Sequence, residues 1–372
     1  MRLIIEKEAL LKALGHVTSV VERRNTIPIL SNVLLEAADG TLKLKATDLD
    51  VEIVETAKAE VSGDGRTTVS AHVFNDIVRK LPDGAQIELS LADDGARLNL
   101  TSGHASFALQ VLPPEDFPDV SAGEMTHGFT IPAADLKRLI EKTRFAISTE
   151  ETRYYLNGIY LHCAESEAGE KLRAVATDGH RLAQVDVPLP EGASGMPGII
   201  VPRKTVHEVY RLIEAADDGV RVELSTSKIR FTAGDVVLTS KLIDGTFPDY
   251  ERVIPKDNDK RLRVARTAFS SAVDRVSTLS SDKGRAVKLQ LGDGKLVLSV
   301  NNPDSGSATE ELDVEFKDDD LEIGFNARYL LDIASQLETD TAEFLLADPG
   351  SPTMVRDDGD TSALYVLMPM RV

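Results

Sequence analysis

Apolar positions along the chain recur every two residues in some stretches and every three to four in others, which predicts short strands interrupted by helices. A strand pattern passes into a helix pattern three times: in RLIIEKEALLKAL from Arg2, in GFTIPAADLKRLI from Gly128 and in LRVARTAFSSAV from Leu262. A second strand-and-helix pattern also occurs three times, from Thr68, Ile199 and Ile323. The predicted helices cover residues 7–24, 72–81, 135–147, 203–214, 266–276 and 327–337.

Hairpin patterns lie between these units, with turns such as Asp39-Gly40 and Asp293-Gly294. Each repeat therefore reads β-α-β-β-β-α-β-β-β, with strands that pair mostly antiparallel. Two similar phrases, PPEDFPDV at 113–120 and DGTFPDYERV at 244–253, come just before the expected boundaries in polar segments near residues 122–126 and 256–260. We predict an α+β protein of three repeated domains, 1–124, 125–256 and 257–372.

Composition narrows the class of protein. With 372 residues, of which 42% are hydrophobic, the chain can bury sizeable cores. It has no apolar run of the roughly 18 residues that a membrane span needs, and Glu6, Lys7 and Glu8 interrupt its first apolar stretch, unlike a signal peptide. The single cysteine, Cys163, excludes an internal disulfide and a cysteine-cluster metal site. These features predict a cytoplasmic protein.

The charge balance is acidic, with 61 Asp and Glu against 42 Lys and Arg and a net charge of −19. Such a balance disfavours a protein that grips nucleic acid through its overall field, and the 5% aromatic content disfavours base stacking on single strands. However, Lys and Arg outnumber or balance the acids on every predicted helix, so the excess of acid lies in strands and loops. Because salt screens charges beyond about 8 Å, a mildly basic helix face can still approach DNA.

The sequence gives little support for an enzyme. The sequence contains no G-x-x-x-x-G-K-[ST], G-x-G-x-x-G, G-x-S-x-G or H-E-x-x-H. Asp178 and His180 in TDGHRL could serve as an acid and base, but a structural turn is the better interpretation. Asp48, Asp50 and Glu52 could bind a divalent cation, although a solvated strand face fits them better. We predict a non-enzyme with no cofactor and no metal.

Several segments in order give the chain a close resemblance to a known family. They are IPILSNVLL (27–35), ATDLD (46–50), RYYLNG (153–158), TDGHRL (177–182), IVPRK (200–204), SKLIDGTFPDYERV (240–253) and MPMR (368–371). In these segments the chain resembles the bacterial DNA polymerase III β subunit, the sliding clamp, and the resemblance extends over essentially all 372 residues.

The resemblance implies a head-to-tail homodimeric ring of six similar domains around double-stranded DNA. An ATP-dependent clamp loader would load it, and it would tether the replicative polymerase α subunit, and other polymerases and repair proteins, through short peptides. Twelve helices, each about 10–12 Å across, would line a circle of roughly 130 Å around a hole on the order of 30 Å. DNA would then be held topologically, with weak contacts that do not depend on its sequence.

The resemblance also implies site residues. The expected partner-peptide pocket comprises Arg153, Leu156, Thr177, Gly179, His180, Arg181, Leu182, Pro248, Arg252, Val253, Val366, Leu367, Met368, Pro369 and Met370. The expected DNA contacts are Arg24, Arg79, Arg203 and Lys204, and the expected dimer interface sets Phe107 and Leu109 against Thr278 and Leu279. Glu150 stands where the family pattern suggests an amide, and an acid there would repel phosphate.

One alternative belongs to another class. A β-rich scaffold that binds peptides and never encircles DNA would share the fold and the pocket but would lack a basic lumen. The C-terminal segment YVLMPMRV (365–372) supports a peptide pocket under either hypothesis, because it is apolar and is expected to lie on a strand without a further partner.

Overall fold

The computed structural model describes residues 1–120, 123–166, 169–213, 219–280 and 285–371. Contacts within the chain divide it into two compact units. The first unit contains Met1–Leu136, Pro190–Ala193 and Lys204–Leu242, and the second contains Lys137–Leu189, Ser194–Arg203 and Ile243–Val372. No helix in the described ranges is long and apolar enough to cross a membrane.

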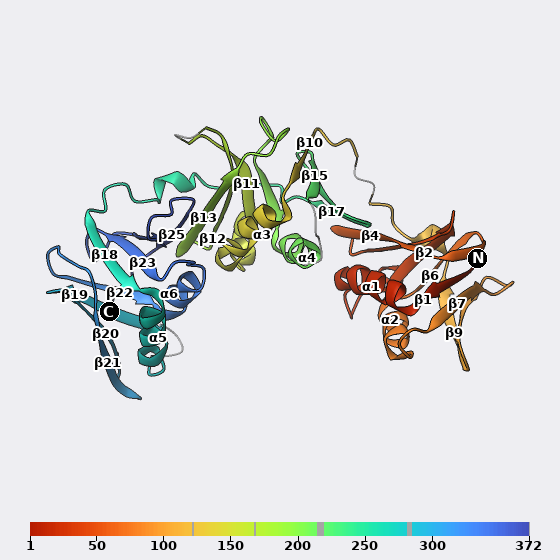
Figure 1. Cartoon of the computed structure of the whole chain (residues 1–372), viewed down its shortest axis with the longest axis horizontal. Helices are drawn as coiled ribbons and strands as arrows, with labels where there is room; N and C mark the ends of the chain where they lie inside the picture. Colours follow the sequence, from red (N-terminus) through yellow and green to blue (C-terminus); the bar gives the residue numbers. More distant parts are fainter. Residues whose placement is uncertain (121–122, 167–168, 214–218, 281–284, 372) are drawn as a thin grey trace. The chain divides into compact units, whose positions relative to one another are not determined.

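The helices and strands follow the three repeats (Figure 1). The first repeat contains β1 (Arg2–Glu6), α1 (Lys7–Val17), β2 (Asn32–Ala38), β3 (Thr41–Thr47), β4 (Val51–Lys58), β5 (Glu60–Gly63), β6 (Gly65–Ser70), α2 (Ala71–Lys80), β7 (Gln86–Leu91), β8 (Arg97–Ser102) and β9 (Ala105–Leu112). The second contains β10 (His127–Ile131), α3 (Ala133–Glu141), β11 (Gly158–Ala164), β12 (Lys171–Thr177), β13 (Arg181–Pro188), β14 (Ile199–Pro202), α4 (Arg203–Ile213), β15 (Val220–Leu224), β16 (Lys228–Ala233) and β17 (Val236–Lys241). The third contains β18 (Lys260–Ala265), α5 (Arg266–Ser277), β19 (Ala286–Gly292), β20 (Lys295–Asn302), β21 (Gly306–Asp313), β22 (Leu321–Asn326), α6 (Ala327–Ala334), β23 (Thr341–Leu346), β24 (Thr353–Asp357) and β25 (Ala363–Leu367).

The predicted α+β class is confirmed, with repeated helices and antiparallel sheets, but the order of elements in each repeat needs a correction. The first repeat has two strands more between its helices than expected, β4 and β5, and the second and third repeats each have one more, β13 and β21. Two of these strands lack a clear alternation of apolar and polar positions. β13 is buried along nearly its whole length, whereas β21 is a largely exposed strand that carries Glu310 and Glu311.

Three predicted helices are shorter than expected, and one of them, predicted over 327–337, ends at Ala334. The helix predicted over 7–24 ends at Val17 and passes into a 3-10 turn over Thr18–Val20, where the Thr18 hydroxyl donates to the Leu14 carbonyl at 2.6 Å. The β-branched residues Thr18, Val20 and Val21 disfavour further helix there. The helix predicted over 135–147 runs instead from Ala133 to Glu141. The expected last residue of the fourth helix, Glu214, lies outside the described residues, as does Ala122 in the first expected linker.

The first unit is organised around a sheet of 13 strands in the order β10-β15-β16-β17-β4-β3-β2-β6-β9-β8-β7-β1-β5. The strands of the first and second repeats join where β17 pairs antiparallel with β4, from Val236 opposite Glu55 to Ser240 opposite Val51. The helices α1 and α2 pack side by side beneath the strands of the first repeat (Figure 1). Their fully buried side chains include Leu10, Leu14 and Phe74.

The second unit contains an eight-stranded sheet, β14-β11-β12-β13-β25-β24-β23-β18, and a four-stranded sheet, β21-β20-β19-β22. In the larger sheet the second and third repeats join where β13 pairs with β25, from Arg181 opposite Leu367 to Val185 opposite Ala363. β24 pairs with the other edge of β25. The expectation that the C-terminal strand lacks a further partner is therefore wrong, because this strand lies inside the sheet.

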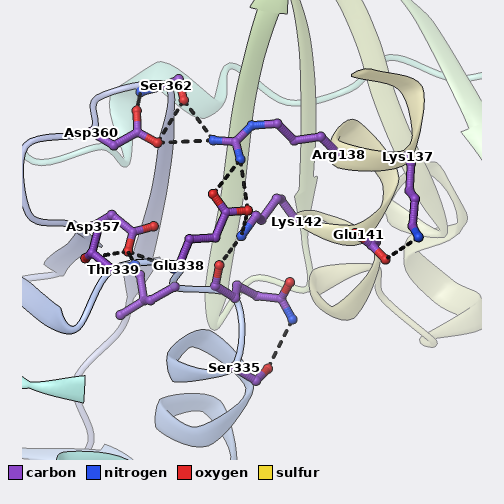
Figure 2. A network of polar contacts seen from close by, with 12 residues as sticks. Lys137, Arg138, Glu141, Lys142, Ser335, Glu338, Thr339, Asp357, Asp360 and Ser362 are labelled. Atoms are coloured by element: carbon purple, nitrogen blue, oxygen red, sulfur yellow. Dashed lines mark hydrogen bonds and ion pairs between the residues drawn. The ribbon is translucent and has the colours of Figure 1, made fainter. Parts of the chain in front are cut away.

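A network of charged and polar side chains joins α3 to the segments that flank β23 and β25 (Figure 2). Arg138 donates through Nη1 to the Glu338 carboxylate at 3.0 Å and through Nη2 to Asp360 Oδ2 at 3.1 Å. Lys142, which is buried, places Nζ 2.8 Å from Glu338 Oε1. The hydrogen bond from Lys142 and the charge of both cations hold the pKa of the Glu338 carboxyl below its ordinary value of 4.5.

We expect Glu338→Gln to lower the free energy of unfolding by about 0.5–1 kcal/mol at neutral pH, a small value because the Glu338 side chain is largely exposed. A lowered pKa stabilises the fold at pH values above the ordinary 4.5, and this contribution is lost as the pH falls through the lowered pKa. Chemical denaturation at several pH values should therefore show that the free energies of unfolding of the original protein and of Glu338→Gln converge at acidic pH.

Glu115→Gln is the matched control, because Glu115 forms an exposed ion pair with Arg66 at 3.1 Å outside this network. If Glu338→Gln lost the same free energy of unfolding at neutral pH and well below pH 4.5, the ionised Glu338 carboxylate would not be what stabilises the fold.

Candidate functional site

Two segments far apart in the sequence meet at one end of the larger sheet of the second unit. Because β13 and β25 are antiparallel and Arg181 lies opposite Leu367, the turn before β13 and the tail after β25 leave the sheet at the same end. The Met368 amide donates to the His180 carbonyl at 2.9 Å, and the Met370 amide donates to the Gly324 carbonyl at 2.8 Å. The TDGHRL turn and the C-terminal tail therefore form one continuous surface.

The TDGHRL turn is held by its own side chains. Asp178 Oδ1 accepts hydrogen bonds from the amides of His180 and Arg181 at 2.9 and 3.0 Å, and the Thr177 hydroxyl donates to the Arg181 carbonyl at 2.7 Å. Gly179 has a φ of 87°, and a Cβ there would lie 2.5 Å from Arg153 Nη1. The backbone conformation therefore favours glycine here, and a larger residue would also displace the end of the Arg153 side chain.

Buried apolar side chains form a floor under this surface. We call this cluster the site floor; it consists of Leu156, Val175, Leu182, Ile200, Phe247, Tyr250 and Val366. Phe247 stacks on Tyr160 with ring centroids 4.8 Å apart. The Tyr250 hydroxyl lies 3.0 Å from His162 Nε2 and accepts from Arg173 at 3.2 Å.

Burial raises the pKa of Tyr250, so the phenol stays protonated at neutral pH. With Phe247 and Tyr250 anchored in the floor, their neighbours Pro248, Arg252 and Val253 remain at the surface. The FPDY segment thus presents one wall of the surface above the floor.

Large apolar side chains are exposed beside the site floor. Val253 is 47% exposed, Met368 is 40% exposed and Tyr154 is 53% exposed. Tyr154 lies beside the segment that leads to Pro248, because a Cβ on Gly245 would lie 3.5 Å from its ring. Tyr154 was missed among the expected site residues, although two consecutive tyrosines in a chain with few aromatic residues were an available signal. Such exposed apolar surface is typical of binding sites.

All the expected pocket residues lie in the second unit, at different depths. The buried members are Leu156, Arg181, Leu182, Val366 and Leu367. The partly buried members are Arg153, Thr177, Pro369 and Met370. The exposed members are Gly179, His180, Pro248, Arg252, Val253 and Met368.

Arg181 is a buried residue with a structural role, since only 8% of its surface is exposed. Its guanidinium contacts Asp178 at 3.1 Å and Asp332 at 2.5 Å, and donates to the Phe145 carbonyl at 2.6 Å. It also lies 4.3 Å from the centroid of the Tyr329 ring. Arg181 therefore fixes the turn to α6 and to the segment after α3.

Glu150 is neutralised by a neighbour. Its carboxylate lies 2.7 Å from Arg153 Nη2 and accepts from Arg153 Nε at 2.8 Å. The hydrogen bond from Arg153 to Glu150 raises the pKa of the Arg153 guanidinium, which remains charged. The acid that was expected to repel phosphate is thus paired with a cation.

The expected DNA contacts differ in how free their charges are. Arg24 and Arg203 are exposed, and Arg203 is the first residue of α4. Arg79 is exposed but contacts Asp76 at 2.8 Å. Lys204 is partly buried and its ammonium contacts the Asp48 carboxylate.

The expected interface residues lie on separate elements. Phe107 and Leu109 are partly buried on β9, which pairs with β8 from Ala105 to Gln110 and with β6 only at Val111 and Leu112. Thr278 is exposed and Leu279 is partly buried just after α5, and the Leu279 carbonyl accepts from Asn302 at 3.0 Å. Within the described ranges, no group of three or more His, Cys, Asp or Glu side chains is placed to hold a metal ion.

Comparisons with known proteins agree over the whole chain. Models of the N-terminal, central and C-terminal domains of the DNA polymerase III beta subunit match residues 1–121, 130–249 and 251–371. The sequence is 54% identical over 372 residues to the beta sliding clamp of Caulobacter vibrioides and 42% identical over 373 residues to that of Escherichia coli, with 100% of each chain covered. The crystal structure of a DnaN sliding clamp from Bartonella birtlesii bound to griselimycin matches with a TM-score of 0.97 and 55% identity, again over 100% of both chains.

We expect Arg181→Ala to lower the free energy of unfolding by about 3 kcal/mol, because it leaves two partly buried carboxylates without their cation. Arg252→Ala is the control from the same surface and should change stability by less than about 0.5 kcal/mol, because the Arg252 side chain is 83% exposed. Thermal and denaturant unfolding followed by circular dichroism would measure both. Equal stability of the two variants would show that Arg181 does not hold the turn.

Proposed function

The chain belongs to the DNA polymerase III beta subunit family, and we propose that two copies of it close head to tail into a ring around duplex DNA. It is a sliding clamp, a processivity factor that keeps DNA polymerase on its template. The observation that carries this conclusion is the match of three consecutive clamp domain models along the chain. The peptide-binding scaffold that never encircles DNA is set aside, because the relatives that match the entire chain are sliding clamps.

We propose domain boundaries near residues 124 and 256, where polar segments follow the two FPD phrases. We further propose a cytoplasmic protein without catalytic activity of its own. The Asp178 carboxylate, a candidate acid, is occupied by hydrogen bonds within its own turn and by Arg181, which supports a structural role. The polymerase that the clamp holds would perform the chemistry.

For DNA, we propose that Arg24, Arg79 and Arg203 make weak phosphate contacts that do not depend on sequence. All three side chains are exposed and carry permanent charge. Arg79 and Lys204 would contribute less, because Asp76 and Asp48 already pair with their charges. A few such contacts suit a ring that must slide, since topology rather than affinity keeps it on the duplex.

For partner proteins, we propose that the surface above the site floor binds short peptides. The polymerase α subunit, other polymerases, repair proteins and the ATP-dependent clamp loader would present a glutamine and two or three apolar residues. Val253, Met368 and Tyr154 are exposed apolar contacts for such residues. Methionine suits a site that takes several peptides, because its side chain repacks easily.

For the dimer, we propose that Phe107 and Leu109 of one copy meet Thr278 and Leu279 of the other. The mostly unpaired outer edge of β9 supports this, because backbone groups there are available to another chain. A contact between different faces of two copies must close into a ring or continue as a filament.

Encirclement is tested by retention on DNA. We expect the loaded protein to stay on a closed circular plasmid during gel filtration and to slip off once the plasmid is cut. Leu279→Glu is the control, because a charge buried in the interface is costly and should yield monomers that are not retained. Equal retention on circular and linear DNA would contradict a ring.

Peptide binding is tested at the exposed apolar contacts. The double variant Val253→Ala with Met368→Ala should weaken binding of a peptide from the polymerase α subunit about tenfold or more, because truncated interface anchors commonly cost above 1 kcal/mol each. Val73→Ala is the matched control, since Val73 is 49% exposed on α2. Fluorescence anisotropy with a labelled peptide gives the affinities, and a change below threefold in the double variant would exclude this surface.

A further inference from the structure

The junction between β4 and β17 in the first unit has the same backbone arrangement as the junction between β13 and β25 in the second. In each case a strand that follows a tight turn pairs antiparallel with the last strand of the next repeat. The Lys241 amide donates to the Asp50 carbonyl at 2.9 Å, just as the Met368 amide donates to the His180 carbonyl at 2.9 Å. The first unit therefore contains a second copy of the backbone that carries the surface above the site floor.

The turn before β4 also has the hydrogen bonds of the TDGHRL turn. Asp48 Oδ1 accepts from the amides of Asp50 and Val51 at 2.9 and 2.7 Å. Leu49 thus corresponds to Gly179, and the two residues have nearly the same φ, 80° and 87°. A leucine is strained in this conformation, whereas a glycine is not.

The side chain of Leu49 gains little burial in return for this strain, because it is 36% exposed. The other residues of the described ranges with positive φ, apart from glycines, are polar: Asp39, Arg285 and Asp293. Backbone strain that the fold itself does not need is a mark of functional positions. Leu49 is therefore a candidate for a contact with another molecule.

Ile27 is a second exposed apolar side chain at this junction, and 45% of it is exposed. It lies five residues before β2, as Arg153 lies five residues before β11. In the second repeat the corresponding residues meet, since a Cβ on Gly179 would lie 2.5 Å from Arg153 Nη1. The repeat thus places Ile27 beside Leu49. We call these two residues the first-junction pair.

Contacts within the first unit support this placement. The Lys204 ammonium contacts the Asp48 carboxylate of the turn and lies 3.4 Å from the Val20 carbonyl, in the segment that leads to Ile27. The residues after Ile27 enter a buried apolar cluster, which consists of Ile29, Leu30, Leu34 and Phe117. Phe117 belongs to the first FPD phrase, as Phe247 of the site floor belongs to the second. Each junction therefore has an apolar cluster of its own.

Exposed apolar side chains concentrate at these two junctions. Among the described residues, five of the six large apolar side chains that are exposed lie there, and Val73 on α2 is the sixth. The five are Ile27, Leu49, Tyr154, Val253 and Met368. The shared backbone and the shared exposure indicate the same kind of ligand at both junctions.

The charges near the first-junction pair suit an uncharged ligand. Three acids of this region are each paired with a lysine: Asp48 with Lys204, Asp50 with Lys241 at 3.0 Å, and Asp119 with Lys45 at 3.3 Å. Arg23 and Arg24, which precede Ile27, are exposed and would also accept an acidic residue. An apolar peptide therefore meets no unpaired acid among these three.

We infer that Ile27 and Leu49 form a second docking position, for the kind of short apolar peptide that the surface above the site floor binds. This inference rests on the proposed function and extends it to two residues that the sequence did not suggest as site residues. The exposed Met368 of the second junction corresponds to Lys241 in the first, so one apolar contact is missing. Binding at the first-junction pair should therefore be about tenfold weaker or more.

Methyl signals in nuclear magnetic resonance spectra report on each position separately. The full-length protein is labelled with ¹³C at its Ile, Leu, Val and Met methyl groups and titrated with an unlabelled peptide from the polymerase α subunit. The signals of Ile27 and Leu49 should shift and reach half-saturation at a peptide concentration at least about tenfold above that for Met368. The Val73 signals should not move, because Val73 is 49% exposed away from both junctions.

Two variants of Leu49 separate docking from folding. Leu49→Gly should weaken binding at Ile27 at least fivefold and leave the affinity at Met368 unchanged, and its melting temperature should be equal or higher because the strain is relieved. Leu49→Asn should have the same effect on binding, since asparagine tolerates positive φ but is polar. Val73→Ala is the matched control and should keep both affinities. Unchanged binding at Ile27 in both Leu49 variants, or a lower melting temperature of Leu49→Gly, would overturn the inference.

Other occupants give different results. Equal shifts at Val73 would mean non-specific adhesion of the peptide, and shifts of Ile27 and Leu49 that depend on protein concentration without peptide would mean that a second copy of the chain covers them. Shifts with a DNA duplex but not with the peptide would assign the pair to DNA. Each of these results would overturn the inference.

The proposed function is tested apart from this inference. A Met368 signal that shifts with peptide while Ile27 and Leu49 stay unchanged would refute the second docking position alone. If Met368 did not respond either, or if the loaded protein were not retained on circular DNA, the proposed function itself would fail.

Discussion

The antiparallel pairing of β13 with β25 is the constraint on which the candidate site depends. Its register places Arg181 opposite Leu367, and every feature above the site floor follows from that alignment. A slip of one residue would exchange the two faces of β25 and move Val366 out of the floor. The pairing of these strands thus sets the position of two segments that come from different repeats.

Charged side chains then decide what can approach each surface. The chain is strongly acidic overall, yet several of its acids are paired locally: Glu150 with Arg153, Asp48 with Lys204, and Glu338 with Arg138 and Lys142. Because exposed charges act over only about 8 Å at physiological salt, such pairing leaves small basic areas intact in an acidic protein. A polyanion would respond to these areas and not to the net charge.

Much of the fold was predictable because the repeated pattern supplies the same information three times. The hairpins and the six helices follow from it, although the strands β13 and β21 were missed because one is buried on both faces and the other is mostly exposed. The sequence also pointed to the segments that form the candidate site, because the TDGHRL turn with Gly179 and the apolar C-terminal segment are distinctive in the sequence. The depth of each residue was not predictable: Leu182 and Val366 are core, and Tyr154 is surface.

The sequence by itself determined the repeat, the helix and strand types and the family, because all of these depend on local patterns or on the order of motifs. Only the tertiary structure decided which charges are free, because ion pairs such as Arg181 with Asp332 or Lys204 with Asp48 join residues more than a hundred positions apart. Distances between such residues depend on strand register and packing, which a local pattern does not encode.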